Sequence, residues 1–262
     1  MTRSPRALPN LLTHWDAIAS RLRDSARVAL FLDFDGTLVP IAPRPDQVHL
    51  AASTRRLLER LASRPRVLVT VISGRRRDEL LHYVAAGNVR YLGLYGWEHA
   101  RRSAIPRPAR SALRRARTLL CENLSAFPGV WLEDKTSSLS VHVAAARPPI
   151  AKSARRRVAI LLRPFRKHLR ILENVRDLEI TPLCVPDKGA ALLQCLSGEF
   201  RHALPVYFGD DYSDEPAFDA ARHGVSVLVG NRRPTHARFG LRGPAEVADA
   251  LLRLEATLAP NA

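Results

Sequence analysis

The sequence contains few cysteines and no long apolar run. Its three cysteines, Cys121, Cys184 and Cys195, form no Cys-x-x-Cys pair, and their odd number in apolar surroundings indicates reduced thiols rather than disulfides or a zinc site. No apolar run approaches the roughly 18 residues that suggest a membrane span. Residues 1–9 carry arginine and proline but not the apolar core of a signal peptide. We therefore expect a cytoplasmic protein without a membrane partner.

Lysine and aromatic residues are also scarce. The formal net charge is +16, but it is carried mostly by arginines spread along the whole chain, and aromatic residues make up only 6%. A nucleic-acid binder needs aromatic rings on which bases stack, and this chain has few. We therefore expect no nucleic-acid partner. A positive field would still attract an anionic substrate such as a phosphate ester.

The overall composition is that of a globular protein. The 262 residues are 46% hydrophobic and 25% charged, which is enough to build one large domain or a core domain with a second domain inserted into it.

Two carboxylates follow the first strongly apolar run of the chain. The run over 28–32 is short and consists of strand-forming residues, so it predicts a fully buried strand of a parallel sheet. Asp33 and Asp35 come directly after it, followed by Gly36 and Thr37. In open α/β sheets, ligands bind at the carboxyl ends of the strands, so this turn is the first candidate for an active site.

The two aspartates can take different roles in a phosphoryl transfer. An ionised Asp33 can act as a nucleophile and as an oxygen ligand of a divalent cation. Asp35 would feel the charge of Asp33, which raises its pKa, and could hold a proton for a leaving group. Gly36 and Thr37 offer an N–H group and a hydroxyl to phosphate oxygens. The alternative is an ordinary aspartate-rich turn, because aspartate and glycine are common turn residues.

Three later segments supply partners for such a site. The apolar run over 67–72 ends in Ser73, Gly74 and Arg75, which could bind phosphate, although a serine N-cap would look the same. Lys188, at a predicted helix start, could neutralise both a nucleophile and a phosphate. A further strand ends at 209, and carboxylates follow it; they are Asp210, Asp211 and Asp214.

The segment between Pro106 and Pro186 has a different pattern from its flanks. It predicts the order helix–strand–strand–helix–strand–strand, whereas the flanking regions alternate strand and helix. We therefore predict a core domain formed by 1–105 and 186–262, with a second domain inserted over 106–185.

These motifs resemble those of a known family. The string from Asp33 to Leu38, with the downstream segments Ile72–Arg75, Asp187–Gly189 and Gly209–Glu215 in the same order, resembles the haloacid dehalogenase (HAD) superfamily, and in particular its trehalose-6-phosphate phosphatases. The resemblance implies a Rossmann-like HAD core with an inserted α/β cap of the C2 type. It also implies an Mg²⁺ site made by Asp33, the carbonyl of Asp35 and Asp210, with Asp211 and Asp214 in support.

In the inserted segment, the resemblance continues over 133–142 and 178–180. It implies sugar-binding roles for four residues: Glu133, Lys135, His142 and Glu179. The chain departs from the family at three places: Tyr95 stands where histidine is common, Ala144 where many members have arginine, and Pro186 where an aromatic residue is usual.

Together these features predict a monomeric, Mg²⁺-dependent phosphatase that hydrolyses trehalose 6-phosphate through an aspartyl-phosphate intermediate. Asp33 would be the nucleophile, Asp35 the general acid and base, and Lys188 the cation beside them. Two alternatives stay open. One is a related phosphatase for another sugar phosphate, of the sucrose-phosphate or mannosylglycerate-phosphate type. The other is a catalytically idle, basic binding or regulatory protein.

Overall fold

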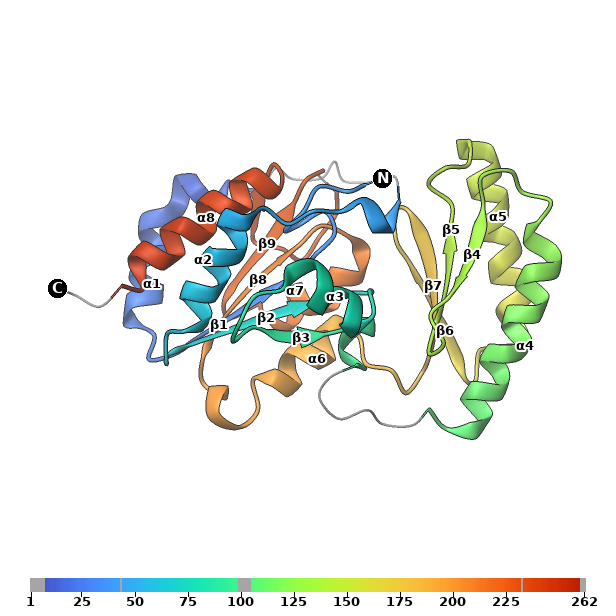
Figure 1. Ribbon diagram of the computed structural model, residues 1–262, viewed down its shortest axis with the longest axis horizontal. Coiled ribbons are helices and arrows are strands. Elements are labelled where there is room, and N and C mark those ends of the chain that lie inside the picture. The colour runs from blue at the N-terminus through green and yellow to red at the C-terminus, as the bar shows by residue number, and fades with distance from the viewer. Residues whose placement is uncertain (1–7, 43, 99–104, 232, 260–262) are drawn as a thin grey trace. The chain divides into compact units, whose positions relative to one another are not determined.

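A computed structural model describes residues 8–42, 44–98, 105–231 and 233–259 (Figure 1). The chain divides into two compact units. The first takes its residues from Met1–His99 and Asp187–Ala262, and the second from Ala100–Pro186. Among the described residues, no helix is both long and apolar enough to cross a bilayer.

The first unit is built on a six-stranded sheet. Its strands, in spatial order, are β10 (Phe239–Leu241), β9 (Val225–Val229), β8 (Leu204–Gly209), β1 (Val28–Leu32), β2 (Val67–Ile72) and β3 (Arg90–Leu92). Every neighbouring pair is parallel. Its helices are α1 (Trp15–Asp24), α2 (Ala52–Ala62), α3 (Arg77–Val84), α6 (Lys188–Cys195), α7 (Glu215–Ala220) and α8 (Pro244–Thr257), and short 3₁₀ turns are η1 (Leu11–His14), η2 (Pro45–Gln47), η3 (Leu94–Gly96), η5 (Gly198–Phe200) and η6 (Tyr212–Asp214).

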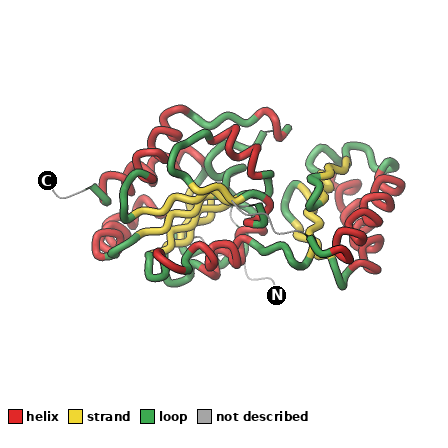
Figure 2. The backbone as a smooth tube through the Cα atoms, turned by 60° about the horizontal axis from the view of Figure 1, so that its bottom comes forward, coloured by secondary structure: helices red, strands yellow, loops and turns green. Residues whose placement is uncertain are grey.

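Helices cover both faces of this sheet, as Figure 2 shows for the strands drawn in yellow. Along β1, Val28, Leu30 and Leu32 pack in a cluster with residues of α1, α2, α3 and α8, whereas Ala29 and Phe31 pack with α6 and α7. Successive side chains of a strand point to opposite faces, so a strand buried on both sides must be apolar throughout. This is why the run over 28–32 shows no polar alternation.

The register of the sheet brings three polar loops to one edge. Leu32 of β1 pairs with Val71 of β2 and with Phe208 of β8. Because the three strands are parallel and in register, their carboxyl ends lie side by side, and the residues that follow each strand are neighbours: Asp33 after β1, Ser73 after β2 and Asp210 after β8.

The second unit is a four-stranded antiparallel sheet with two helices. The strands β4 (Trp131–Asp134), β5 (Leu139–His142), β7 (Asp177–Pro182) and β6 (Leu169–Glu173) pair in that order. The helices α4 (Arg107–Leu124) and α5 (Pro148–Leu162) pack on one face of it in a separate apolar cluster, and the 3₁₀ turn η4 (Arg163–Phe165) follows α5. The order of these elements is the one that the sequence predicts.

One predicted element is shorter than expected. The amphipathic pattern over 10–27 predicts a single helix, but the structure has the 3₁₀ turn η1 followed by α1, which ends at Asp24. Asn10 explains the tight start, because its side chain accepts a hydrogen bond from the N–H of Leu12 and caps the 3₁₀ turn.

Candidate active site

Asp33 is buried at the carboxyl end of β1 and is tied to two other elements. Its N–H donates to the carbonyl of Phe208 on β8 (3.0 Å), and its Oδ1 accepts a hydrogen bond from Nζ of Lys188 on α6 (2.7 Å). Only 4% of Asp33 is exposed. Burial raises the pKa of Asp33 to about 7, although Lys188 opposes the rise. The carboxylate is thus desolvated and fixed in one orientation.

Asp214 holds Lys188 and the start of the loop after β8 in place by hydrogen bonds. Its Oδ1 accepts from Lys188 Nζ (2.7 Å) and from the hydroxyl of Tyr207 (2.6 Å), and its Oδ2 accepts from the N–H groups of Asp210 and Asp211 (3.0 and 2.9 Å). Both carboxylate oxygens are therefore engaged. Burial lowers the pKa of Lys188, but Asp214 and Asp33 more than offset it, so that the pKa lies above its usual value and Lys188 is a fixed cation.

Asp210 lies against the turn that carries Asp33 and Asp35. Gly36 has a φ of +83°, and a Cβ built on it would lie 2.0 Å from Oδ2 of Asp210. The glycine therefore provides both the left-handed backbone and the space for this carboxylate. Burial and the nearby charge of Asp33 raise the pKa of Asp210 well above its usual range.

The carboxylates at this edge form a potential cation site. Oxygens of Asp33, Asp210 and Asp214 lie within 4.8 Å of one another. Oxygen donors in such a set are the ligands that Mg²⁺ prefers, and a divalent cation would relieve the repulsion between Asp33 and Asp210. Asp214 already accepts four hydrogen bonds, so Asp33 and Asp210 are the carboxylates with room for a metal.

Asp35 has a partner that the sequence interpretation did not include. Nε and Nη2 of Arg75 donate to its two carboxylate oxygens, both at 2.7 Å, which is a bidentate ion pair. Arg75 is only 8% exposed, and its guanidinium lies over the rings of Phe34 and Tyr83, at 5.5 and 5.1 Å from their centroids. Arg75 is predicted to bind phosphate, but in the structure its guanidinium binds the carboxylate of Asp35.

The remaining predicted phosphate-binding groups surround the same turn. The hydroxyl of Thr37 is buried and has no hydrogen-bond partner in the described part of the chain, so a phosphate oxygen would satisfy it. The hydroxyl of Ser73 accepts from the N–H of Arg75 (3.2 Å). The left-handed Tyr95 (φ 60°) packs against Gly74, where a Cβ would lie 2.7 Å from the tyrosine oxygen.

The second unit brings its four predicted residues together on one face of its sheet. Nζ of Lys135 donates to Oε1 of Glu179 (2.5 Å), and Nε2 of His142 lies 2.8 Å from Oε2 of Glu133. Burial lowers the pKa of Lys135, but Glu179 and Glu133 more than offset it and raise the pKa above its usual value. Burial raises the pKa of Glu179, and Lys135 opposes this. The cluster holds donors and acceptors in fixed positions.

Two residues that sequence reasoning missed support the first cluster. Tyr207 belongs to the apolar strand β8, where its hydroxyl was the only signal of a polar role. Arg233 donates to the carbonyl of Asp211 (2.6 Å) and pairs with Glu215, and its guanidinium lies 4.5 Å from the centroid of Tyr212. Asp211 caps the turn η6 by accepting from the N–H of Tyr212 (2.7 Å). Arg233 thus braces the loop after β8.

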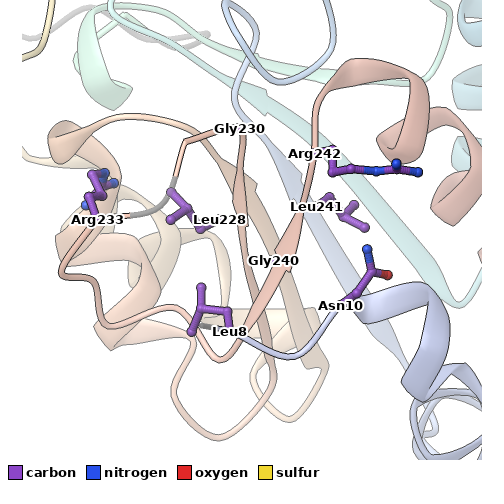
Figure 3. A pocket seen from close by; sticks show the side chains of 8 residues that line it. All are labelled: Leu8, Asn10, Leu228, Gly230, Arg233, Gly240, Leu241 and Arg242. Carbon is purple, nitrogen blue, oxygen red and sulfur yellow. The ribbon is translucent and has the colours of Figure 1, made fainter. Parts of the chain in front are cut away.

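A cavity of about 210 Å³ lies elsewhere in the first unit (Figure 3). It is bounded by β9, β10 and the segment around Asn10, and its walls include Leu8, Leu228 and Leu241. None of the predicted site residues lines it, so the candidate site is defined by the converging carboxylates and not by the size of a cavity.

Comparison with known proteins identifies the family of this chain. The model of the trehalose-phosphatase family matches residues 31–244. A probable trehalose-phosphate phosphatase of Oryza sativa subsp. japonica is 31% identical over 94% of this chain and 74% of its own length. A trehalose-phosphate phosphatase of Mycobacterium tuberculosis is 34% identical over 86% of this chain and 61% of its own.

A solved structure gives the same fold. The C-terminal domain of a trehalose-6-phosphate phosphatase from C. albicans superimposes with a TM-score of 0.84, covering 96% of this chain and 100% of that domain, at 20% sequence identity. At this identity, the likeness concerns the fold alone. The HAD-type α/β fold that the sequence predicts is confirmed.

Proposed function

The chain belongs to the trehalose-phosphatase family, and we propose that it hydrolyses trehalose 6-phosphate to trehalose and phosphate, with Mg²⁺ as cofactor and through an aspartyl-phosphate intermediate. The observation that carries this proposal is the buried Asp33, held by Lys188 beside Asp210. The names of the rice and mycobacterial relatives support the substrate.

In the first step, a carboxylate oxygen of Asp33 attacks phosphorus and the bond from phosphorus to the sugar oxygen breaks. Asp35 gives its proton to that leaving oxygen, which departs as the hydroxyl of the sugar. Lys188 keeps Asp33 oriented and places a positive charge beside the transferring group, where negative charge would otherwise repel the nucleophile.

In the second step, Asp35 removes a proton from a water molecule. The water oxygen attacks phosphorus, and the bond from phosphorus to Asp33 breaks, which releases phosphate and restores both aspartates. Arg75 binds both carboxylate oxygens of Asp35 and so keeps this side chain in place for the step. Thr37, Gly36 and Ser73 would bind phosphate oxygens in both steps.

The metal would be held by Asp33, Asp210 and the carbonyl of Asp35. When bound, Mg²⁺ would neutralise charge on the phosphate oxygens and fix the phosphate relative to Asp33. Asp211 and Asp214 would orient this set through the loop after β8.

The sugar would be bound by the second unit. Glu133, Lys135, His142 and Glu179 present carboxylate acceptors and nitrogen donors, which together can hydrogen-bond several hydroxyl groups. A neutral disaccharide suits such a mixed set better than an anion does.

The test is phosphate release from a panel of esters in the presence of Mg²⁺. The panel contains trehalose 6-phosphate, glucose 6-phosphate, sucrose 6-phosphate, mannosylglycerate phosphate and p-nitrophenyl phosphate. We expect kcat/KM to favour trehalose 6-phosphate by about 100-fold or more, and we expect EDTA to remove the activity and added Mg²⁺ to restore it. Preference for another sugar phosphate would reject the substrate, and inactivity on the whole panel would favour a binding or regulatory role.

The variant Asp33→Asn tests the covalent mechanism. It keeps the shape of the side chain and removes the nucleophile, so kcat should fall by about 10³-fold or more. Thermal unfolding checks that the variant is folded. Turnover near the wild-type rate would rule out Asp33 as the nucleophile.

A further inference from the structure

An exposed tryptophan lies in the second unit on the same face as the predicted sugar-binding residues. We propose that Trp131, stacked on His142, forms an aromatic platform that binds the face of one sugar ring of the substrate. This inference rests on the proposed function, because it assigns a specificity-determining residue to the same reaction. Trp131 lies outside every motif on which the family resemblance rests.

The pairing of the strands places Trp131 on this face. Trp131 lies opposite His142, Glu133 opposite Ser140, and His142 opposite Asp177. The intervening residues of these strands pack under α4 and α5; they are Leu132, Val141 and Leu178. Trp131 therefore points away from the helices, toward the charged side of the sheet.

Trp131 is unusually open for its type. It is 45% exposed, while Val141 and Leu178, on the other face of the sheet, are completely buried. Tryptophan has the largest apolar side chain, and leaving it in water forgoes the free energy that its burial would contribute. Nearly half of the residue thus stays exposed after folding and is available to a ligand.

The ring is held in a fixed orientation. The centroids of Trp131 and His142 are 3.8 Å apart and their planes differ by 14°, which is a parallel stack. Nε2 of His142 is in turn 2.8 Å from Glu133. One face of the indole is covered by the imidazole, and the carboxylate of Glu133 contacts the imidazole at Nε2. Because little rotamer freedom remains to be lost, the platform is organised before a ligand arrives.

The charges around the platform select the chemistry of the ligand. Glu133, Asp177 and Glu179 lie on this face, and Lys135 is already paired with Glu179. A phosphate group would be repelled here, whereas hydroxyl groups can donate to the carboxylates. The ligand must therefore combine an apolar C–H face with a ring of hydroxyls, which is the surface of a pyranose. The phosphate-bearing end belongs with Lys188 and Thr37.

Steady-state kinetics of Trp131→Ala and Trp131→Phe test the platform. We expect Trp131→Ala to raise KM for trehalose 6-phosphate by about 10-fold with little change in kcat, and Trp131→Phe to stay within about threefold of the wild type. Turnover of p-nitrophenyl phosphate, which has no sugar, should be unchanged. The matched control is Ile160→Ala on α5, which removes an equally exposed apolar side chain (46%) from a helix of the same unit.

A direct binding measurement separates this inference from the proposed function. Trehalose, the neutral product, is titrated into the Asp33→Asn variant with and without Trp131→Phe, and the tryptophan fluorescence is recorded. A saturable change that disappears with Trp131→Phe supports the platform, even if trehalose 6-phosphate proves not to be the preferred substrate. Failure of the proposed function would appear in the wild-type panel instead.

Three outcomes would overturn the inference. The first is an unchanged KM in Trp131→Ala. The second is an equal loss of activity on trehalose 6-phosphate and p-nitrophenyl phosphate, which would indicate a structural role. The third is a change in the sedimentation of Trp131→Ala, which would show that this face pairs with a second copy of the chain.

Discussion

Two buried cations serve the first cluster in different ways. Lys188 is a point charge that bridges Asp33 and Asp214 through a single nitrogen. Arg75 is a planar fork that fixes both oxygens of Asp35 and itself lies over two aromatic rings. Only a guanidinium can make the second arrangement, so lysine and arginine are not interchangeable here.

At the residue scale, Arg75→Lys should therefore impair Asp35 more than it impairs the rest of the site. We expect kcat for the sugar phosphate to fall by about 10- to 100-fold, because Asp35 would no longer be aligned with the leaving oxygen. Turnover of p-nitrophenyl phosphate should fall by about threefold or less, since its leaving group needs no proton. Both rates are measured as phosphate release.

The control for this prediction is Arg60→Lys. Arg60 makes a similar two-nitrogen contact with Glu255, but on the surface of the first unit. This substitution should leave both rates unchanged. Equal losses on the two esters in Arg75→Lys would mean that Arg75 acts on the phosphate, as the sequence interpretation has it, and not through Asp35.

Sequence reasoning identified the groups of the site better than their pairings. Asp33, Asp35, Lys188 and Asp210 follow predicted strands or begin a predicted helix, and strand ends can be located from apolar patterns. The pairing of Asp35 with Arg75 depends on side-chain orientation between segments far apart in the chain, which no local pattern encodes. Arg75 was therefore assigned to phosphate binding, and Tyr207 was given no role in the site.

At the element scale, the site depends on how closely two loops approach. The loop after β1 and the loop after β8 meet where Gly36 leaves room for the carboxylate of Asp210. Parallel pairing of β1 with β8 sets this approach, because Leu32 and Phe208 are in register.

The variant Gly36→Ala tests this approach. The new Cβ would clash with Asp210 and would also be strained at a φ of +83°, so we expect a loss of at least about 2 kcal/mol in the free energy of unfolding. We also expect Mg²⁺ to bind about 10-fold more weakly or worse, because Asp210 must move. Thermal unfolding and isothermal titration calorimetry measure the two effects.

Gly87→Ala is the matched control. Gly87 is exposed and has open space where a Cβ would lie, so the change should shift the free energy of unfolding by no more than about 1 kcal/mol. If Gly36→Ala behaved like Gly87→Ala in both measurements, the two loops would not be as close as described.

The elements themselves could be predicted well where the apolar pattern is strong. The buried strands β1 and β2 and the order of the second unit follow from runs of strand-forming residues and helical periodicity. The helix expected over 10–27 is shorter because Asn10 caps a 3₁₀ turn and the backbone leaves the helix after Asp24. Apolar periodicity reports which face is buried and says little about where hydrogen bonding stops.

At the scale of the whole molecule, the positive net charge should speed up the association of the anionic substrate. With a net charge of +16, the chain attracts an anionic ester over a distance set by the ionic strength. We expect kcat/KM for the sugar phosphate to fall about threefold or more between about 20 and 300 mM NaCl, with kcat within about twofold. Inhibition by neutral trehalose is the control and should not change. If salt weakened inhibition by trehalose as much as it lowered kcat/KM for the sugar phosphate, the salt would be acting on the protein itself.

The order of the strands in the first sheet also bears on how the chain folds during synthesis. β1 pairs with β2, close in sequence, and with β8, whose residues begin at Leu204, and the whole second unit lies between them. The second unit is continuous in sequence, so it can complete its sheet as it leaves the ribosome. In the first unit, one edge of β1 has no partner until β8 has been synthesised. Asp33 and Lys188 thus meet only late in translation, and pulsed hydrogen exchange on stalled chains should protect β5 and β7 before β1.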